Sequence, residues 1–135
     1  DTPGIAFHVE VAEPYAYVLA ENSGLHIIDI SDPADPVEIG VYNTPGSTGG
    51  LAVAGNFAYV GAGDSGLRII DISDQANPVE AGFYDTPGYA AGVAVSATSN
   101  LVYVVDGLEG TLRIIKVSDP AVPFEKGSFT TAGYA

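Results

Sequence analysis

Residues 66–88, with the sequence GLRIIDISDQANPVEAGFYDTPG, decide the fold because this stretch occurs three times in the chain. A close copy, GLHIIDISDPADPVEIGVYNTPG, covers residues 24–46, and a more divergent one, TLRIIKVSDPAVPFEKGSFTTAG, covers residues 111–133. The starts of the copies lie 42 and 45 residues apart. A repeat of this length predicts an array of similar units, each of them one supersecondary motif.

Each repeat contains four short runs rich in Val, Ile and Tyr, separated by Gly, Pro, Asp and Asn. Runs of this length and composition predict β-strands joined by tight turns, and no segment has the 3.6-residue period of a helix. We expect twelve strands, at residues 6–12, 15–20, 25–30, 36–42, 50–54, 57–61, 67–72, 78–84, 91–96, 101–105, 112–117 and 123–129.

The four strands of a repeat differ in character. The first carries small residues on one face in the second and third repeats, which suits a crowded position near an axis. The third is apolar on both faces and is therefore expected inside a stack. The fourth begins with Pro and contains Glu, which suits an outer edge facing solvent. The pattern is typical of one β-propeller blade. We expect three four-stranded antiparallel blades, at about residues 1–42, 43–84 and 85–129, with residues 130–135 starting a further repeat.

The segments AYVGAGDSG (residues 58–66), GLRIIDIS (66–73) and NPVEAGFYDTPG (77–88) resemble LVIVD repeats. These propeller-forming repeats occur in bacterial and archaeal proteins that are mostly secreted or on the cell surface. The resemblance covers nearly the entire chain. It implies a propeller scaffold and an extracellular or cell-surface location, and it supplies no catalytic residues.

Three blades do not close a ring, because known propellers have about four to eight. The simplest completion is a homodimer in which two chains form six blades about a two-fold axis. The alternative is that these 135 residues, which begin at Asp1 rather than Met, are an engineered or excised fragment of a longer propeller.

Charge and composition exclude several classes of function. The chain has 17 acidic and four basic residues, a net charge of −13, and no cysteine. Such an acidic protein repels phosphate backbones, so we expect no nucleic-acid partner. No apolar run approaches the roughly 20 residues that span a bilayer, so we expect no membrane insertion. The lack of cysteine excludes disulfides and thiol catalysis.

His8 and Glu10 are where the first repeat departs most from the others, since the second repeat has Gly50 and Ala52 there. Residues two apart in a strand share a face. The two side chains could form a channel-facing acid–base pair or a metal-ligand site. Alternatively, they could fill the seam between the first blade and the third blade of a partner.

The turns between blades and those between second and third strands are expected at one rim of the propeller. There Asp64, Tyr89 and Asp106 are our remaining candidates for ligand binding. A mouth lined by carboxylates, with one aromatic ring, suits Ca²⁺, a sugar or a cationic ligand. Alternatively, the acidic residues only close the turns. No EF-hand pattern is present, and no cofactor is expected.

Other acidic residues and His26 have structural interpretations. Asp29 and Asp71 are expected to hold the following Ser-Asp turn. His26 matches Arg68 and Arg113, which predicts a surface series along the third strands. Because no nucleophile elbow or triad is present, we predict a non-enzymatic scaffold that self-associates and binds a small molecule, a carbohydrate or a protein. The alternatives are a metal-assisted hydrolase or a sugar-binding module that uses the acidic mouth, or an engineered or excised fragment with only a structural role.

Overall fold

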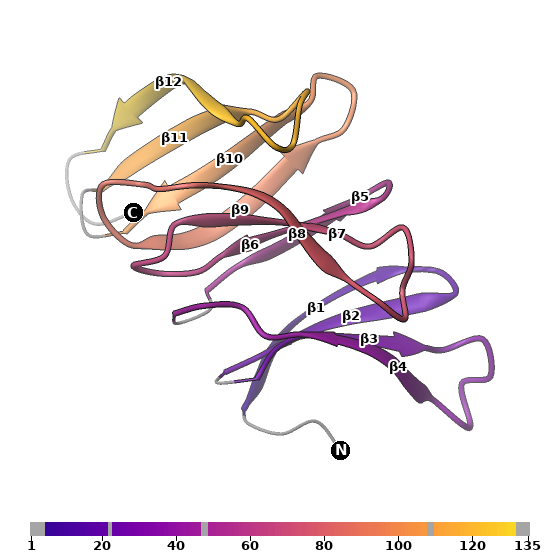
Figure 1. Ribbon diagram of the computed structural model, residues 1–135. Coiled ribbons are helices and arrows are strands. Elements are labelled where there is room, and N and C mark those ends of the chain that lie inside the picture. Colours follow the sequence, from indigo (N-terminus) through magenta and orange to yellow (C-terminus); the bar gives the residue numbers. More distant parts are fainter. Residues whose placement is uncertain (1–4, 22, 47–48, 108–109, 132–135) are drawn as a thin grey trace.

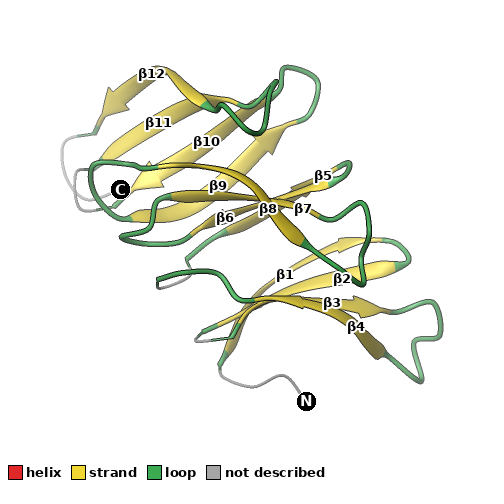
Figure 2. Ribbon diagram, in the orientation of Figure 1, coloured by secondary structure: helices red, strands yellow, loops and turns green. Residues whose placement is uncertain are grey.

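The computed structural model describes residues 5–21, 23–46, 49–107 and 110–131, and within them every regular element is a strand (Figure 2). No helix that could span a membrane occurs in this described part. The strands, which Figure 1 labels, are β1 (Ala6–Ala12), β2 (Tyr15–Ala20), β3 (Gly24–Asp29), β4 (Val37–Tyr42), β5 (Leu51–Ala54), β6 (Phe57–Gly61), β7 (Leu67–Asp71), β8 (Val79–Tyr84), β9 (Ala90–Ser96), β10 (Leu101–Asp106), β11 (Thr111–Lys116) and β12 (Phe124–Thr130).

These strands form three antiparallel sheets of four, each a simple meander of one repeat: β1-β2-β3-β4, β5-β6-β7-β8 and β9-β10-β11-β12. We refer to them as blades 1, 2 and 3. The predicted all-β fold is confirmed, and each predicted strand agrees with the observed one within one residue at either end. The turn expected at residues 1–4 and the repeat start at residues 132–135 lie outside the described residues.

The blades stack face to face, with β1, β5 and β9 as neighbouring inner strands (Figure 1). One apolar core lies between blades 1 and 2 and includes Leu19, Ile27 and Val60. A second lies between blades 2 and 3 and includes Leu67, Ile69 and Val102. All six side chains are fully buried, and burial of each stabilises the fold by about 1.5–3 kcal/mol. The core of this protein therefore lies between its blades.

A β-bulge recurs in the outer hairpin of every blade, where the register shifts after Ile27, Ile69 and Ile114. Bulges re-aim the side chains around them. Here the glutamate of each fourth strand pairs with a basic residue of the third strand: Glu38 with His26, Glu80 with Arg68, and Glu125 with Arg113. These glutamates were expected only to face solvent. Glu80 and Glu125 also form ion pairs with the arginines and Glu38 forms a hydrogen bond with His26, because the bulge turns them toward the third strand.

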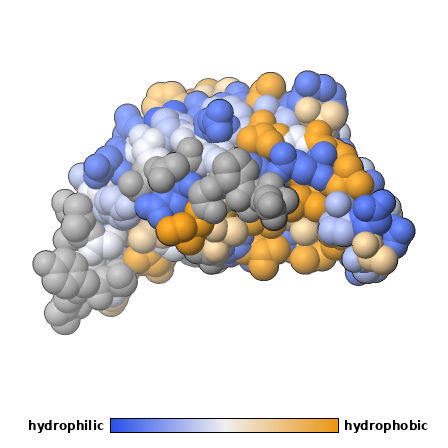
Figure 3. All heavy atoms as spheres, turned by 90° about the horizontal axis from the view of Figure 1, so that it is seen from below, coloured by the Kyte–Doolittle hydropathy of each residue, from blue (hydrophilic) through white to orange (hydrophobic). Residues whose placement is uncertain are grey.

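Two blade faces have no neighbour within the described chain. The leading face of blade 1 carries Val9, Val11, Ala16, Val18, His26, Ile28, Glu38 and Val41, which the strand register places on one side. The trailing face of blade 3 carries Ala94, Tyr103, Val105, Leu112, Ile114, Gly127 and Phe129. Val9 is 56% exposed and Phe129 is 67% exposed. Figure 3 views the molecule from the side of blade 1 and shows hydrophobic residues over a broad area.

Candidate functional site

His8 and Glu10 form a pair on the innermost strand of blade 1. His8 Nε2 lies 3.2 Å from Glu10 Oε2, and both side chains are partly exposed. His8 lies opposite Leu19 and Glu10 lies opposite Tyr17, and the latter two pack in the core against blade 2. The alternative in which this pair fills a seam with a partner's third blade stays a prediction, and His8 also borders a small pocket with Val9 and Val18. The register turns both residues toward blade 2, and the leading face carries Val9 instead.

The loops bring Asp64, Tyr89 and Asp106 to the same rim, as predicted. Gly63 and Ala90 exchange two backbone hydrogen bonds of 3.0 and 3.1 Å, which places their neighbours Asp64 and Tyr89 next to each other. Asp64 is exposed and Tyr89 is half-buried. The arrangement leaves a carboxylate and a phenol at the surface. Their role in ligand binding stays a prediction.

Asp106 differs from those two because its side chain is 0% exposed. The backbone amides of Gly88 and Tyr89 donate hydrogen bonds of 2.9 Å to its two carboxylate oxygens. Arg113 Nε donates a third, of 3.3 Å. The corresponding residue of blade 2 is Ala62. We conclude that Asp106 holds the loop between blades 2 and 3, which leaves its carboxylate no free surface for a ligand.

The short acidic turns follow the predicted pattern. Asp29 Oδ1 accepts a hydrogen bond of 2.8 Å from the amide of Ser31, and Asp71 Oδ1 accepts one of 2.9 Å from the amide of Ser73. Hydrogen bonds from the Ser73 side chain and backbone lower the pKa of Asp71. These residues are therefore turn formers. Within the described ranges, no three His, Asp or Glu side chains come together as a group that could hold a metal ion.

His26 is not the surface residue that its sequence position predicted, because it is only 1% exposed. Its Nδ1 lies 2.7 Å from Glu38 Oε1, and its Nε2 lies 2.8 Å from Ser23 Oγ. The imidazole is shorter than an arginine side chain. It is held between the Glu38 and Ser23 side chains, whereas Arg68 and Arg113 are 16% and 12% exposed.

Sequence reasoning missed a contact that links successive blades. The Tyr42 hydroxyl donates to Glu80 Oε1 at 3.2 Å, and the Tyr84 hydroxyl donates to Glu125 Oε1 at 3.5 Å. Burial, followed by the charge of Glu80, raises the pKa of Tyr42. The sequence feature that could have predicted this contact is the Tyr that ends the fourth strand in the first two repeats. The third repeat has Phe129 at that position.

Two hydroxyls at the rim were also missed. The Oγ1 atoms of Thr44 and Thr86 are buried and have no hydrogen-bond partner among the described residues. Both belong to the Thr-Pro-Gly turn that starts a repeat. A buried hydroxyl without a partner lowers the free energy of unfolding by about 1–3 kcal/mol, so each of these hydroxyls destabilises its turn.

Solved structures with a similar fold are propeller-like. The chain matches a protein of unknown function from Desulfotomaculum acetoxidans DSM 771 with a TM-score of 0.77 and 17% identity, over 98% of this chain and 44% of that one. It matches the computationally designed protein Ika8 with a TM-score of 0.75 and 14% identity, over 96% and 38% of the two chains. At these identities the likeness shows the fold alone.

A third similar structure is the β-propeller domain of Cps50 (Swd1) from Myceliophteria thermophila, with a TM-score of 0.74 and 13% identity, over 96% of this chain and 46% of that one. The chain thus spans less than half the length of each of these three proteins. No curated protein matches it.

The sequence family is shown by a separate comparison. The LVIVD repeat matches three times in succession, at residues 3–44, 45–86 and 87–131. These matches coincide with the three observed blades and cover nearly all of the chain. The chain therefore belongs to the LVIVD-repeat family, and its three repeats form propeller blades.

Proposed function

We propose that this chain is a non-enzymatic propeller module that pairs with a second copy of itself to close a six-bladed ring and serves as a binding scaffold. The observation that carries the proposal is the equivalence between the two open faces and the faces that pack together inside the chain. Each open face repeats, position for position, one side of an existing contact between blades.

The trailing face of blade 3 corresponds to a buried surface in blades 1 and 2. Tyr103 and Ile114 stand where blade 2 has Tyr59 and Ile69, and those two are 5% and 0% exposed against blade 3. In the same way, Val9 on the leading face of blade 1 stands where blade 2 has the buried Leu51. The leading face of one copy is thus built to receive the trailing face of another.

A glycine in the fourth strand supports the same pairing. A Cβ added to Gly40 would collide with the carbonyl oxygen of Gln75, and one added to Gly82 would collide with that of Pro120. In both cases the obstacle is the turn between the third and fourth strands of the next blade. Gly127 is the equivalent residue of blade 3, and a Cβ there meets nothing within 4 Å. The space over Gly127 fits the corresponding turn of a second copy.

A two-fold ring would use this contact twice. The leading face of each copy packs against the trailing face of the other. The two copies therefore close a ring in which no blade face stays exposed. Large exposed apolar faces are uncommon on monomeric proteins, and covering them provides the driving force. A second copy is the occupant whose surface already matches.

The non-enzymatic part of the proposal is supported by how the candidate chemical groups are used. The carboxylate of Asp106 holds a loop, and Asp29 and Asp71 hold turns. Binding to the exposed rim residues Asp64 and Tyr89 is the scaffold role that the geometry leaves open. A location at the cell surface or in a secreted protein rests on the family resemblance.

Two glycine variants test the pairing. Gly127→Ala should leave the thermal unfolding of the single chain nearly unchanged but weaken self-association, because only the partner's turn would touch the new methyl group. Gly82→Ala is the matched control, which should destabilise the chain itself. Thermal unfolding and sedimentation of both proteins give the two readouts. A Gly127→Ala protein that associates as tightly as the parent would overturn the proposal.

A further inference from the structure

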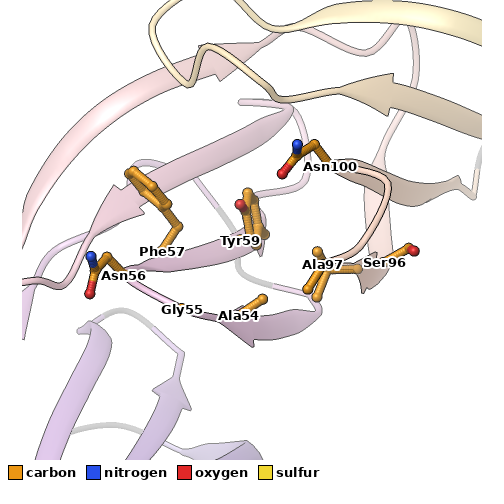
Figure 4. Close-up of a pocket in the computed structure, with 9 residues that line it drawn as sticks. Ala54, Gly55, Asn56, Phe57, Tyr59, Ser96, Ala97 and Asn100 are labelled. Carbon is orange, nitrogen blue, oxygen red and sulfur yellow. The ribbon is translucent and has the colours of Figure 1, made fainter.

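A cleft of about 260 Å³ lies between blades 2 and 3, at the end of the strands opposite the acidic rim. Its lining residues come from the β5–β6 hairpin, the β9–β10 turn and the adjoining strand ends: Ala54, Gly55, Asn56, Phe57, Tyr59, Val95, Ser96, Ala97 and Asn100. Figure 4 shows the rings of Phe57 and Tyr59 on β6, with the Asn100 amide pointing toward them from the turn. No charged residue lines this cleft.

The Tyr59 hydroxyl has an unusual position in the cleft. Tyr59 is 5% exposed and lines the cleft. The equivalent Tyr17 has a side-chain hydrogen bond with Gln75 of the next blade. Blade 3 has Pro120 in place of Gln75, and proline has no polar side-chain atom. Blade 3 therefore offers Tyr59 no polar side chain at the position that Gln75 holds for Tyr17.

A tyrosine phenol is protonated and able to donate at neutral pH, and burial raises the pKa of Tyr59 further. Its ring lies 6.5 Å from that of Phe57, with the two planes tilted by 44°. The cleft thus combines the half-buried ring of Phe57 with the phenol of the more deeply buried Tyr59.

The opposite wall is specific to this pair of blades. Residues 96–100 form the longer turn that accounts for most of the change in repeat length from 42 to 45. Asn100 has a φ of 55°, and its carbonyl oxygen accepts a hydrogen bond of 2.9 Å from the amide of Val117. Ser96 Oγ lies 2.8 Å from Ser99 Oγ. The turn is therefore held in place before any ligand arrives, which lowers the entropic cost of binding.

We propose that this cleft binds a neutral carbohydrate, with one sugar ring against Phe57 and its hydroxyl groups on the Tyr59 phenol and the Asn100 amide. Aromatic rings cover the apolar face of a sugar, and neutral amide and hydroxyl groups match its polar edge. The absence of basic residues from the lining and the net charge of −13 disfavour an anion. A ligand pocket typically begins at roughly 300 Å³, so the cleft accommodates about one ring.

The test titrates the whole chain with the methyl glycosides of glucose, galactose, mannose and N-acetylglucosamine, followed by amide chemical shifts. We expect saturable shifts at Phe57, Ser96 and Asn100 with at least one of them, and weaker binding of glucuronate than of glucose. The cleft lies within one chain, so the result is independent of ring closure.

Two variants remove one polar group each. Tyr59→Phe keeps the ring, and Asn100→Gly suits the left-handed backbone at that position. Each should weaken binding of the responding sugar about 3- to 10-fold, the effect of one hydrogen bond. Tyr17→Phe, the matched change between blades 1 and 2, should leave the affinity unchanged. The proposal is overturned if no glycoside gives saturable shifts, or if either cleft variant binds as tightly as the parent chain.

Discussion

The Tyr42 hydroxyl of blade 1 donates a hydrogen bond of 3.2 Å to Glu80 of blade 2, and Arg68 holds the same carboxylate at 3.2 Å. Tyr84, Glu125 and Arg113 repeat this arrangement between blades 2 and 3. The two open faces carry the remaining pieces, with Phe129 on one and the Glu38–His26 pair on the other. The contact between two copies would therefore lack the tyrosine hydroxyl that links blades within a copy.

Phe129→Tyr should restore that hydroxyl and strengthen self-association. Each new hydrogen bond contributes about 1 kcal/mol, and the ring contains two such contacts, so the dimer dissociation constant should fall roughly 30-fold. Sedimentation at several concentrations measures it. Phe83→Tyr, the same chemical change at a position away from both open faces, is the control and should have no effect. An unchanged dissociation constant for Phe129→Tyr would place Phe129 outside the contact.

Asp106→Asn should destabilise the chain by about 2 kcal/mol, because hydrogen bonds to a buried charged acceptor contribute about 1.5–3 kcal/mol each and the amide replaces one acceptor with a donor. The free energy of unfolding in urea checks this. Asp64→Asn, at an exposed position on the same rim, should change stability by less than about 0.5 kcal/mol. Equal effects of the two substitutions would contradict the structural role of Asp106.

Thr86→Val should stabilise the chain by about 1 kcal/mol, because it removes a buried hydroxyl without a partner and keeps the shape of the side chain. Thr111→Val is the control. Thr111 Oγ1 lies 3.3 Å from Thr130 Oγ1, so its loss should bring no gain. Urea unfolding distinguishes the two. A destabilised Thr86→Val protein would mean that this hydroxyl has a partner, such as water or a ligand.

Stability should fall in alkali. Burial raises the pKa values of Tyr17, Tyr42, Tyr59 and Tyr84 above the ordinary value of 10.0. Above that value the unfolded chain loses protons that the folded chain retains, so the free energy of unfolding decreases as pH rises through the folded-state values. Below about pH 10 this contribution is fully present. Unfolding measured at about pH 8 and pH 11, together with tyrosinate absorbance, tests the sign, and equal stability at both would contradict it.

The sequence alone predicts the strands well because Asp, Pro and Gly indicate the turns of each repeat. These residues occur at equivalent positions in the three copies, which fixes the strand boundaries. The sequence does not predict the burial or the hydrogen-bond partners of single polar residues. Asp106, at the end of β10, and Asp64, in a loop, are both acidic residues of the same rim, and only the structure shows that Asp106 is buried. The face on which His8 lies depends on strand register, and the cleft beside Tyr59 depends on the exchange of Gln75 for Pro120 in a different blade.

The mass of the chain in solution tests the central claim most directly. Sedimentation equilibrium over a range of micromolar concentrations should give a single species of twice the chain mass of 13.8 kDa, since two copies complete the ring. A stable 13.8 kDa species throughout that range, with the valines of the leading face still exposed, would contradict the account.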